Sequence, residues 1–178
     1  ILVTYHSSIS RLTMYSVHRR LGLESLKTIS AVDAEKESPY WEEIRSHKID
    51  PHIVQGLHAG AAYQGQQKLA RGEVVGMLSD LNQRPGPGNY RANVAGRLYH
   101  LKAGFADLAL ITGVKVIPYL NKITPDGKVH TIFLPPFKAE GDDRHSQHGS
   151  LILQYADFLT QCWKTTPETL FWSNITKH

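Results

Sequence analysis

EVVGMLSD, residues 73–80, is an apolar run that closes in polar residues, and it indicates the architecture more clearly than any other segment. A short continuous apolar run of this kind is typical of an interior strand in a parallel sheet, because such a strand is covered on both faces. Residues 1–5, ILVTY, form a second run of the same kind, rich in β-branched side chains. We therefore expect two buried strands, each followed by a polar residue.

Outward from these strands, predicted helices and strands alternate along the chain. Apolar periodicity, caps and turn residues set their limits. We expect a helix from Ser8 or Ser10 through Leu21, a strand over 25–30, helical segments over 39–70 broken near Pro51, a loop over 82–93 (NQRPGPGNYRAN), a helix over 103–112, a strand over 114–120 joined through the turn 124–127 to a strand over 129–134, and a helix from Ser150 to just before Pro167.

This alternation predicts an α/β fold, a single-domain sandwich with a mixed, mostly parallel sheet flanked by helices. The hairpin supplies the antiparallel pair. A length of 178 residues and a mass of 20.0 kDa fit one domain, which we expect to span residues 1–178. Because the sequence starts inside an apolar strand, we expect a fragment or the C-terminal part of a longer chain.

Composition narrows the class of protein. The single cysteine, Cys162, allows no internal disulfide and no cysteine-based zinc site, which favours a cytoplasmic location. No run approaches the ~18–20 apolar residues of a membrane span, so we expect a soluble chain or one peripheral on the cytoplasmic face of the inner membrane. A net charge of +4 and a pI near 9.2 favour anionic partners without choosing among phospholipid, nucleic acid and an acidic carrier protein.

Two residues at strand ends are the candidate catalytic groups. His6 follows the first strand and precedes a predicted helix, so it would stand at the carboxyl edge of the sheet, where open α/β folds bind ligands. An imidazole there suits a general base, although from position alone a solitary histidine more often caps a helix or makes a local hydrogen bond. Asp80 ends the next strong strand and could orient the base, bind substrate hydroxyls or cap the following loop.

After Asp80, five cationic or titratable groups lie within the nineteen residues 84–102. A phosphate-bearing substrate would explain them, and so would a solvated basic face. Nucleic-acid binding through this segment would show a steep salt dependence, and we do not expect it. The residues are Arg84, Arg91, Arg97, His100 and Lys102.

His145 and His148 have the spacing of metal ligands, but their polar, glycine-flanked segment favours an exposed loop, and we expect no metal. Four aromatic side chains near the C-terminal end are expected in the core rather than at a membrane interface. They are Tyr155, Trp163, Phe171 and Trp172.

The order of these pieces resembles the lipid A biosynthesis (lauroyl/myristoyl) acyltransferase family, within the lysophospholipid acyltransferase-like superfamily. The resemblance spans nearly the whole chain, and five pieces in the right order and spacing carry it. They are the strand ending in His6, the Gly72-led strand ending in Asp80 with Gln83 after it, Gly96 and Gly104 with Leu108-Ala109, the run 112–118 (TGVKVIP), and Pro167-Glu168 before Phe171-Trp172.

The resemblance implies a glycerolipid acyltransferase-like fold and an O-acyltransferase. The acyl chain would move from an acyl carrier protein or coenzyme A thioester to a hydroxyl of a lipid or glycolipid acceptor, with no cofactor beyond the thioester and with peripheral membrane contact. The family's His-x4-acid motif stands here as His6 to Arg11, so the acid is replaced by a cation. Ala95 also stands in place of an aromatic residue, and the basic residues expected after Trp172 are reduced to Lys177 and His178.

Arg11 cannot accept a hydrogen bond from an imidazole, and it disfavours the imidazolium. Either another carboxylate orients His6, with Asp80, Asp33 and Glu24 as candidates, or acyl transfer is weak or lost. Arg11 could instead bind the oxyanion. The alternative function is a catalytically degenerate relative that serves as a lipid-binding or scaffold module in a larger biosynthetic assembly. Besides His6 and Asp80, the substrate-binding candidates are Arg11, Arg84, Arg91, Arg97 and Lys102.

Overall fold

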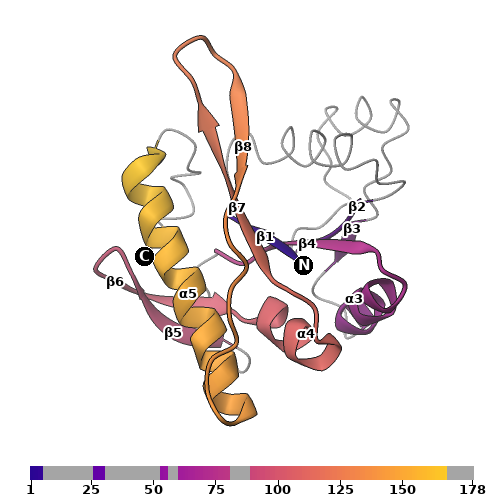
Figure 1. Cartoon of the computed structure of the whole chain (residues 1–178). Helices are drawn as coiled ribbons and strands as arrows, with labels where there is room; N and C mark the ends of the chain where they lie inside the picture. Colours follow the sequence, from indigo (N-terminus) through magenta and orange to yellow (C-terminus); the bar gives the residue numbers. More distant parts are fainter. Residues whose placement is uncertain (6–25, 31–52, 56–59, 81–88, 168–178) are drawn as a thin grey trace.

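The structure, a computed structural model, describes residues 1–5, 26–30, 53–55, 60–80 and 89–167 (Figure 1). Among the described residues, groups of two or three strands are each followed by a helix. In order they are β1 (Leu2–Thr4), β2 (Leu26–Ser30), β3 (Ile53–Gln55), α3 (Gly60–Ala70), β4 (Val74–Leu78), β5 (Asn89–Val94), β6 (Arg97–Lys102), α4 (Gly104–Thr112), β7 (Ile117–Ile123), β8 (Val129–Phe133) and α5 (Arg144–Thr165).

Six strands form one mixed sheet in the order β3-β2-β4-β1-β7-β8. The first five run parallel, and β8 is antiparallel to β7. This confirms the prediction of an α/β fold with a mixed, mostly parallel sheet, and it confirms strands within residues 1–5, 25–30 and 73–80. The apolar runs 1–5 and 73–80 are adjacent at the centre of the sheet, with Leu2 paired with Gly76 and Thr4 with Leu78.

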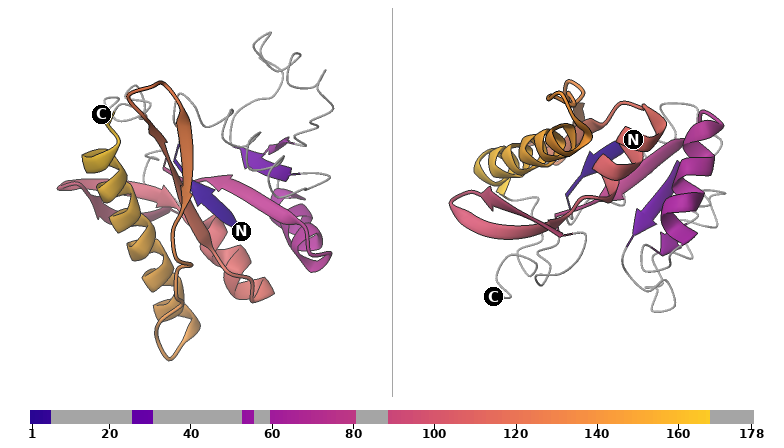
Figure 2. Two further views of the ribbon diagram at one scale, coloured as in Figure 1. Left: turned by 45° about the horizontal axis from the view of Figure 1, so that its top comes forward. Right: turned by 90° about the horizontal axis from the view of Figure 1, so that it is seen from below.

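The main core lies between one face of this sheet and the helices. Strand alternation sends Val3 and Tyr5 of β1 and its continuation to this face, and both are fully buried. Helix α4 contacts both α3 and α5, and α5 also packs against β5 and β7 (Figure 2). The prediction for α4 is confirmed to within a residue, and Gly113 ends this helix with φ 69°, a left-handed conformation that glycine adopts without strain.

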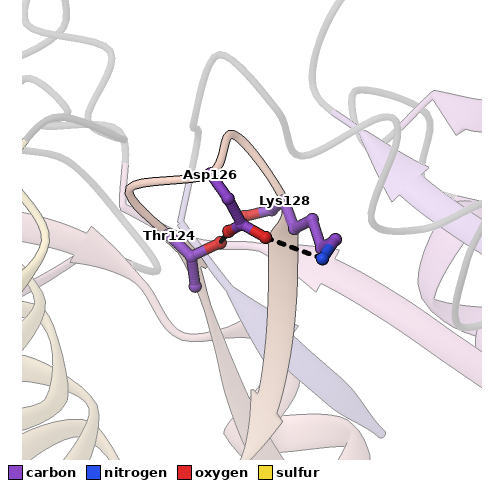
Figure 3. Close-up of polar contacts among 3 residues, drawn as sticks. All are labelled: Thr124, Asp126 and Lys128. Atoms are coloured by element: carbon purple, nitrogen blue, oxygen red, sulfur yellow. Dashed lines mark hydrogen bonds and ion pairs between the residues drawn. The ribbon is translucent and has the colours of Figure 1, made fainter.

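The β7–β8 hairpin projects beyond the rest of the ribbon (Figure 1). Its turn is held by Asp126, whose carboxylate accepts a hydrogen bond from the Thr124 hydroxyl and lies 2.7 Å from the Lys128 ammonium (Figure 3). The predicted turn and hairpin are confirmed, although β7 begins at Ile117 rather than Val114. In front of it, Val114 is partly buried and Val116 is buried against the core, so these apolar side chains pack without joining a strand.

The loop predicted over 82–93 is wrong at its C-terminal end, where residues 89–94 form β5. Its proline and glycine residues stop at Gly88, and beyond them the chain pairs antiparallel with β6. Ala95 and Gly96 make the tight turn between the strands with φ 51° and 82°. Positive φ at two successive residues matches the right-handed twist of a hairpin. The Asn93 side chain accepts from the Gly96 amide at 2.8 Å and helps to hold this turn.

Two further expectations are corrected. The segment 39–70 contains the strand β3 as well as α3, because Ile53-Val54 is β-branched and finds a partner in β2. Helix α5 begins at Arg144 rather than Ser150, because the Asp143 carboxylate accepts from the Ser146 amide at 2.8 Å and so caps the helix.

Among the described helices, none has both the length and the apolar character required to cross a bilayer.

Candidate functional site

The carboxyl ends of β1 and β4 form the centre of the candidate site. Thr4 and Leu78 are the last residues of these adjacent parallel strands, and they are paired in register. In the sequence, His6 and Asp80 each stand two residues beyond that pair. Asp80 is partly buried. His6 lies outside the described residues, as do Arg11, Asp33 and Glu24.

A tyrosine hydroxyl from α5 joins the two strand ends. Tyr155 Oη donates to the Thr4 carbonyl at 2.8 Å and accepts from the Ser79 amide at 3.3 Å. Tyr155 is completely buried, and its ring packs against Phe105 and Phe158 with centroids 5.1 and 5.9 Å away. The prediction that Tyr155 belongs to the core is confirmed, but its hydroxyl also reaches the edge where His6 and Asp80 follow in the sequence.

Asp80 influences several buried groups on the α5 side of the sheet. Burial raises the pKa of Tyr155 well above its ordinary value, and the negative charge of Asp80 raises it further. Burial likewise raises the pKa of the Cys162 thiol to about 12, with Asp80 as a smaller cause. The thiol is fully buried and stays protonated at neutral pH, so Cys162 is not suited to nucleophilic catalysis.

The structure separates the predicted cations into two groups. Arg91 pairs across the β5–β6 hairpin with His100, and Lys102 occupies a position on the same face, turned away from the buried residues Ala92 and Leu101. We call Arg91, His100 and Lys102 the outer basic face.

Arg97 does not belong to this outer basic face. It pairs with the buried Val94 next to the turn and remains exposed. Burial raises the pKa of the Tyr99 hydroxyl. The positive charge of Arg97 lowers this pKa, and the negative charge of Asp80 raises it. The charges of Arg97 and Asp80 therefore act on one hydroxyl, whereas Arg91 and Lys102 lie on the opposite side of the hairpin. Arg84 lies outside the described residues.

The two histidines at metal-ligand spacing lie in the first two turns of α5 rather than in a loop, which corrects the sequence expectation. His145 is exposed, whereas His148 is buried, with Nε2 3.0 Å from a carboxylate oxygen of Asp107 on α4. The His148 ring also stacks against Tyr90 of β5 with centroids 4.6 Å apart. The residue therefore connects three elements. Within the described ranges, no group of three histidine, cysteine or acidic side chains is close enough to hold a metal ion.

Asn121 is a buried polar residue of the sheet that was not among the sequence-predicted site residues. Asn121 of β7 is fully buried, and its Oδ1 accepts from the Thr131 hydroxyl at 3.3 Å. Its Nδ2 has no hydrogen-bond partner in the part of the chain that the structure describes. An unpaired buried donor is costly, at about 1–3 kcal/mol. The predicted strand ended at Leu120, one residue before Asn121, whereas β7 continues to Ile123.

Comparisons with known proteins do not assign the chain to a family. No protein-family model matches it, and no curated protein matches it. The resemblance carried by the five sequence pieces therefore remains a prediction.

Proposed function

We propose that this chain is an O-acyltransferase with a glycerolipid acyltransferase-like fold. It moves a fatty acyl chain from an acyl carrier protein or coenzyme A thioester to a hydroxyl of a lipid or glycolipid acceptor, and His6 is the general base. The observation that carries the proposal is the register of β1 and β4, in which the pair Thr4–Leu78 precedes His6 and Asp80 by two residues each. Ligands of open α/β sheets bind at this carboxyl edge.

The reaction needs a base because a hydroxyl is a weak nucleophile until its proton is removed. His6 takes that proton while the acceptor oxygen attacks the thioester carbonyl, and a new C–O bond forms. The tetrahedral oxyanion then collapses, the C–S bond breaks, and the leaving sulfur receives the proton from the imidazolium. Asp80 supplies a negative charge at the same sheet edge, which favours the imidazolium, and Arg11 or backbone N–H groups bind the oxyanion.

The substrates bring negative charge to the site, and the cations are available to bind it. A phosphate on the acceptor or on the carrier's pantetheine arm suits guanidinium groups, which bind phosphate through two parallel hydrogen bonds. Arg91 and Lys102 would act as one unit, because both lie on the outer basic face, on the opposite side of the hairpin from Arg97. Arg11, Arg84 and Arg97 complete the proposed substrate-binding set.

The experiment is a transfer assay on the full chain with radiolabelled lauroyl-coenzyme A or lauroyl–acyl carrier protein. Vesicles that contain a hydroxyl-bearing phosphoglycolipid serve as acceptor. His6→Ala should lower the rate about 100-fold or more, because a general base contributes about 10²–10⁴-fold. His145→Ala is the matched control, since His145 is exposed on α5 and should leave the rate unchanged.

The possible outcomes separate the two functions left open by the sequence. Transfer that depends on His6 supports the enzyme. Transfer that survives His6→Ala refutes the role of His6 as base. Binding of the lauroyl donor without turnover in either protein refutes the enzyme and supports the lipid-binding or scaffold module.

A further inference from the structure

The Tyr155 hydroxyl occupies an unusual position between two strands of the sheet. It accepts from the Ser79 amide at 3.3 Å and donates to the Thr4 carbonyl at 2.8 Å, so it links one backbone group on each side. Both groups belong to residues at the point where the strands end, since Thr4 and Leu78 are the last pair between β1 and β4. A side chain from α5 therefore continues the connection between the strands past their last pair.

A hydroxyl bridge differs from a direct rung of the sheet in the spacing that it sets. A direct N–H···O=C bond holds its two heavy atoms at about 2.9 Å. With the hydroxyl between them, two hydrogen bonds separate the Ser79 nitrogen from the Thr4 oxygen. The two chains are therefore linked at Thr4 and Ser79 through the tyrosine oxygen rather than by a direct backbone hydrogen bond.

The bridge is rigid because the rest of Tyr155 cannot move easily. The side chain is fully buried against Phe105 and Phe158, and the helix that carries it packs against α4, β5 and β7. A completely buried hydroxyl with both a donor and an acceptor bond is also strongly held, since losing either bond would leave a backbone group unpaired.

We propose that Tyr155 is a positioning residue: its hydroxyl sets the separation of the β1 and β4 ends, and thereby the geometry of the sheet edge that the proposed function uses. The catalytic consequence rests on the proposed function, whereas the effect on the two strand ends does not. Tyr155 touches no reacting atom in this scheme and acts only through Thr4 and Ser79.

The test compares Tyr155→Phe with Tyr99→Phe. Both changes remove one hydroxyl from a buried ring, but the Tyr99 hydroxyl has no hydrogen-bond partner among the described residues. Two readouts need no activity: hydrogen exchange of the Ser79 amide, and the NMR titration of the His6 ring followed at its Cε1–H. Two others use the lauroyl transfer assay: kcat and KM measured separately, and the pH profile of kcat.

We expect Tyr155→Phe to speed exchange at Ser79 at least tenfold, to shift the His6 titration, and to lower kcat about tenfold or more with KM nearly unchanged. Tyr99→Phe should resemble the wild type in every readout. If the two variants behave alike, Tyr155 is a packing residue and the inference is overturned. If the wild type transfers no acyl chain, the proposed function fails, yet exchange and titration still decide whether Tyr155 positions the strand ends.

A folding failure of Tyr155→Phe would leave one decisive measurement on the unaltered chain. The Tyr155 hydroxyl proton should then be slow to exchange with water and should show a nuclear Overhauser contact to the Ser79 amide proton. A proton that exchanges rapidly, with no such contact, would contradict the bridge itself.

Discussion

Gly141 should be the least replaceable glycine of the described chain, and Gly141→Ala should lower the stability of the fold by about 2 kcal/mol or more. Its φ of 123° lies in a region that residues with a Cβ rarely adopt, which alone costs about 1–3 kcal/mol. An added Cβ would also overlap the Cβ of Ser146 and stand 3.2 Å from that residue's carbonyl carbon and 3.3 Å from the Gln147 nitrogen.

The overlap matters because Ser146 belongs to the cap of α5. Its amide and hydroxyl donate to the two carboxylate oxygens of Asp143 at 2.8 and 3.0 Å, and a cap of this kind contributes about 1 kcal/mol. Moving the first turn aside would lose those bonds. For a chain of this length, a loss of about 2 kcal/mol corresponds to a fall in Tm of about 4–8 °C.

The assay is urea unfolding followed by far-UV circular dichroism, with Gly149→Ala as the matched control. A Cβ at Gly149 meets no atom of the described residues within 4 Å, and this position lies inside α5. Alanine there should raise stability by up to about 1 kcal/mol, through helix propensity. Equal midpoints for Gly141→Ala and the wild type would refute the reasoning about strain and the cap.

Three further predictions concern a thiol, an ion pair and a turn. Burial raises the pKa of Cys162 to about 12, so above about pH 9 only the unfolded thiol ionises. The free energy of unfolding should therefore be unaffected by this group below pH 9 and should fall by up to about 1.4 kcal/mol per pH unit above it. Urea midpoints measured at pH 8, 9.5 and 10.5 should fall less steeply in Cys162→Ala than in the wild type. Asp107→Ala should cost about 0.2–1 kcal/mol in urea unfolding, because the half-exposed Asp107 carboxylate lies 3.0 Å from His148 Nε2, and an unchanged midpoint would show that the contact is not stabilising. Ala95→Asn should raise Tm and gain about 0.5–1 kcal/mol, since asparagine tolerates the positive φ of this turn better than alanine; a lower Tm would contradict that account.

Much of the sheet was predictable because most of its strands have a clear local sequence pattern. Apolar runs bounded by polar or turn residues gave β1, β4 and the β7–β8 hairpin, and Gly113 correctly marked the end of α4. The errors fall where local signals conflict. In β5 the inward-facing residues include the small Ala92, so the alternation of apolar and polar side chains is weak. The proline and glycine residues just before β5 also favoured a loop at this position.

The candidate site was predictable only as far as positions along strands allow. Asp80 follows β4 as expected, but no pattern in the sequence connects it with a tyrosine 75 positions later, since Tyr155 reaches the β1–β4 edge only because α5 packs across the sheet. The separation of Arg91 from Arg97 depends on the register of the β5–β6 hairpin, a property that pairing rather than composition decides.

The place of β1 between β4 and β7 has a consequence for biosynthesis. The Thr4 hydroxyl donates to the Tyr119 carbonyl across a separation of 115 residues, so the last neighbour of β1 is synthesised long after β1 itself. At translation rates of about 5–20 residues per second, roughly 6–23 s pass between the two. Throughout that delay, the apolar strand β1 lacks its β7 neighbour, so one edge of the strand is unpaired and prone to aggregation. Ribosome-bound chains halted before Tyr119 should therefore recruit chaperones, and the released chain of 178 residues should not.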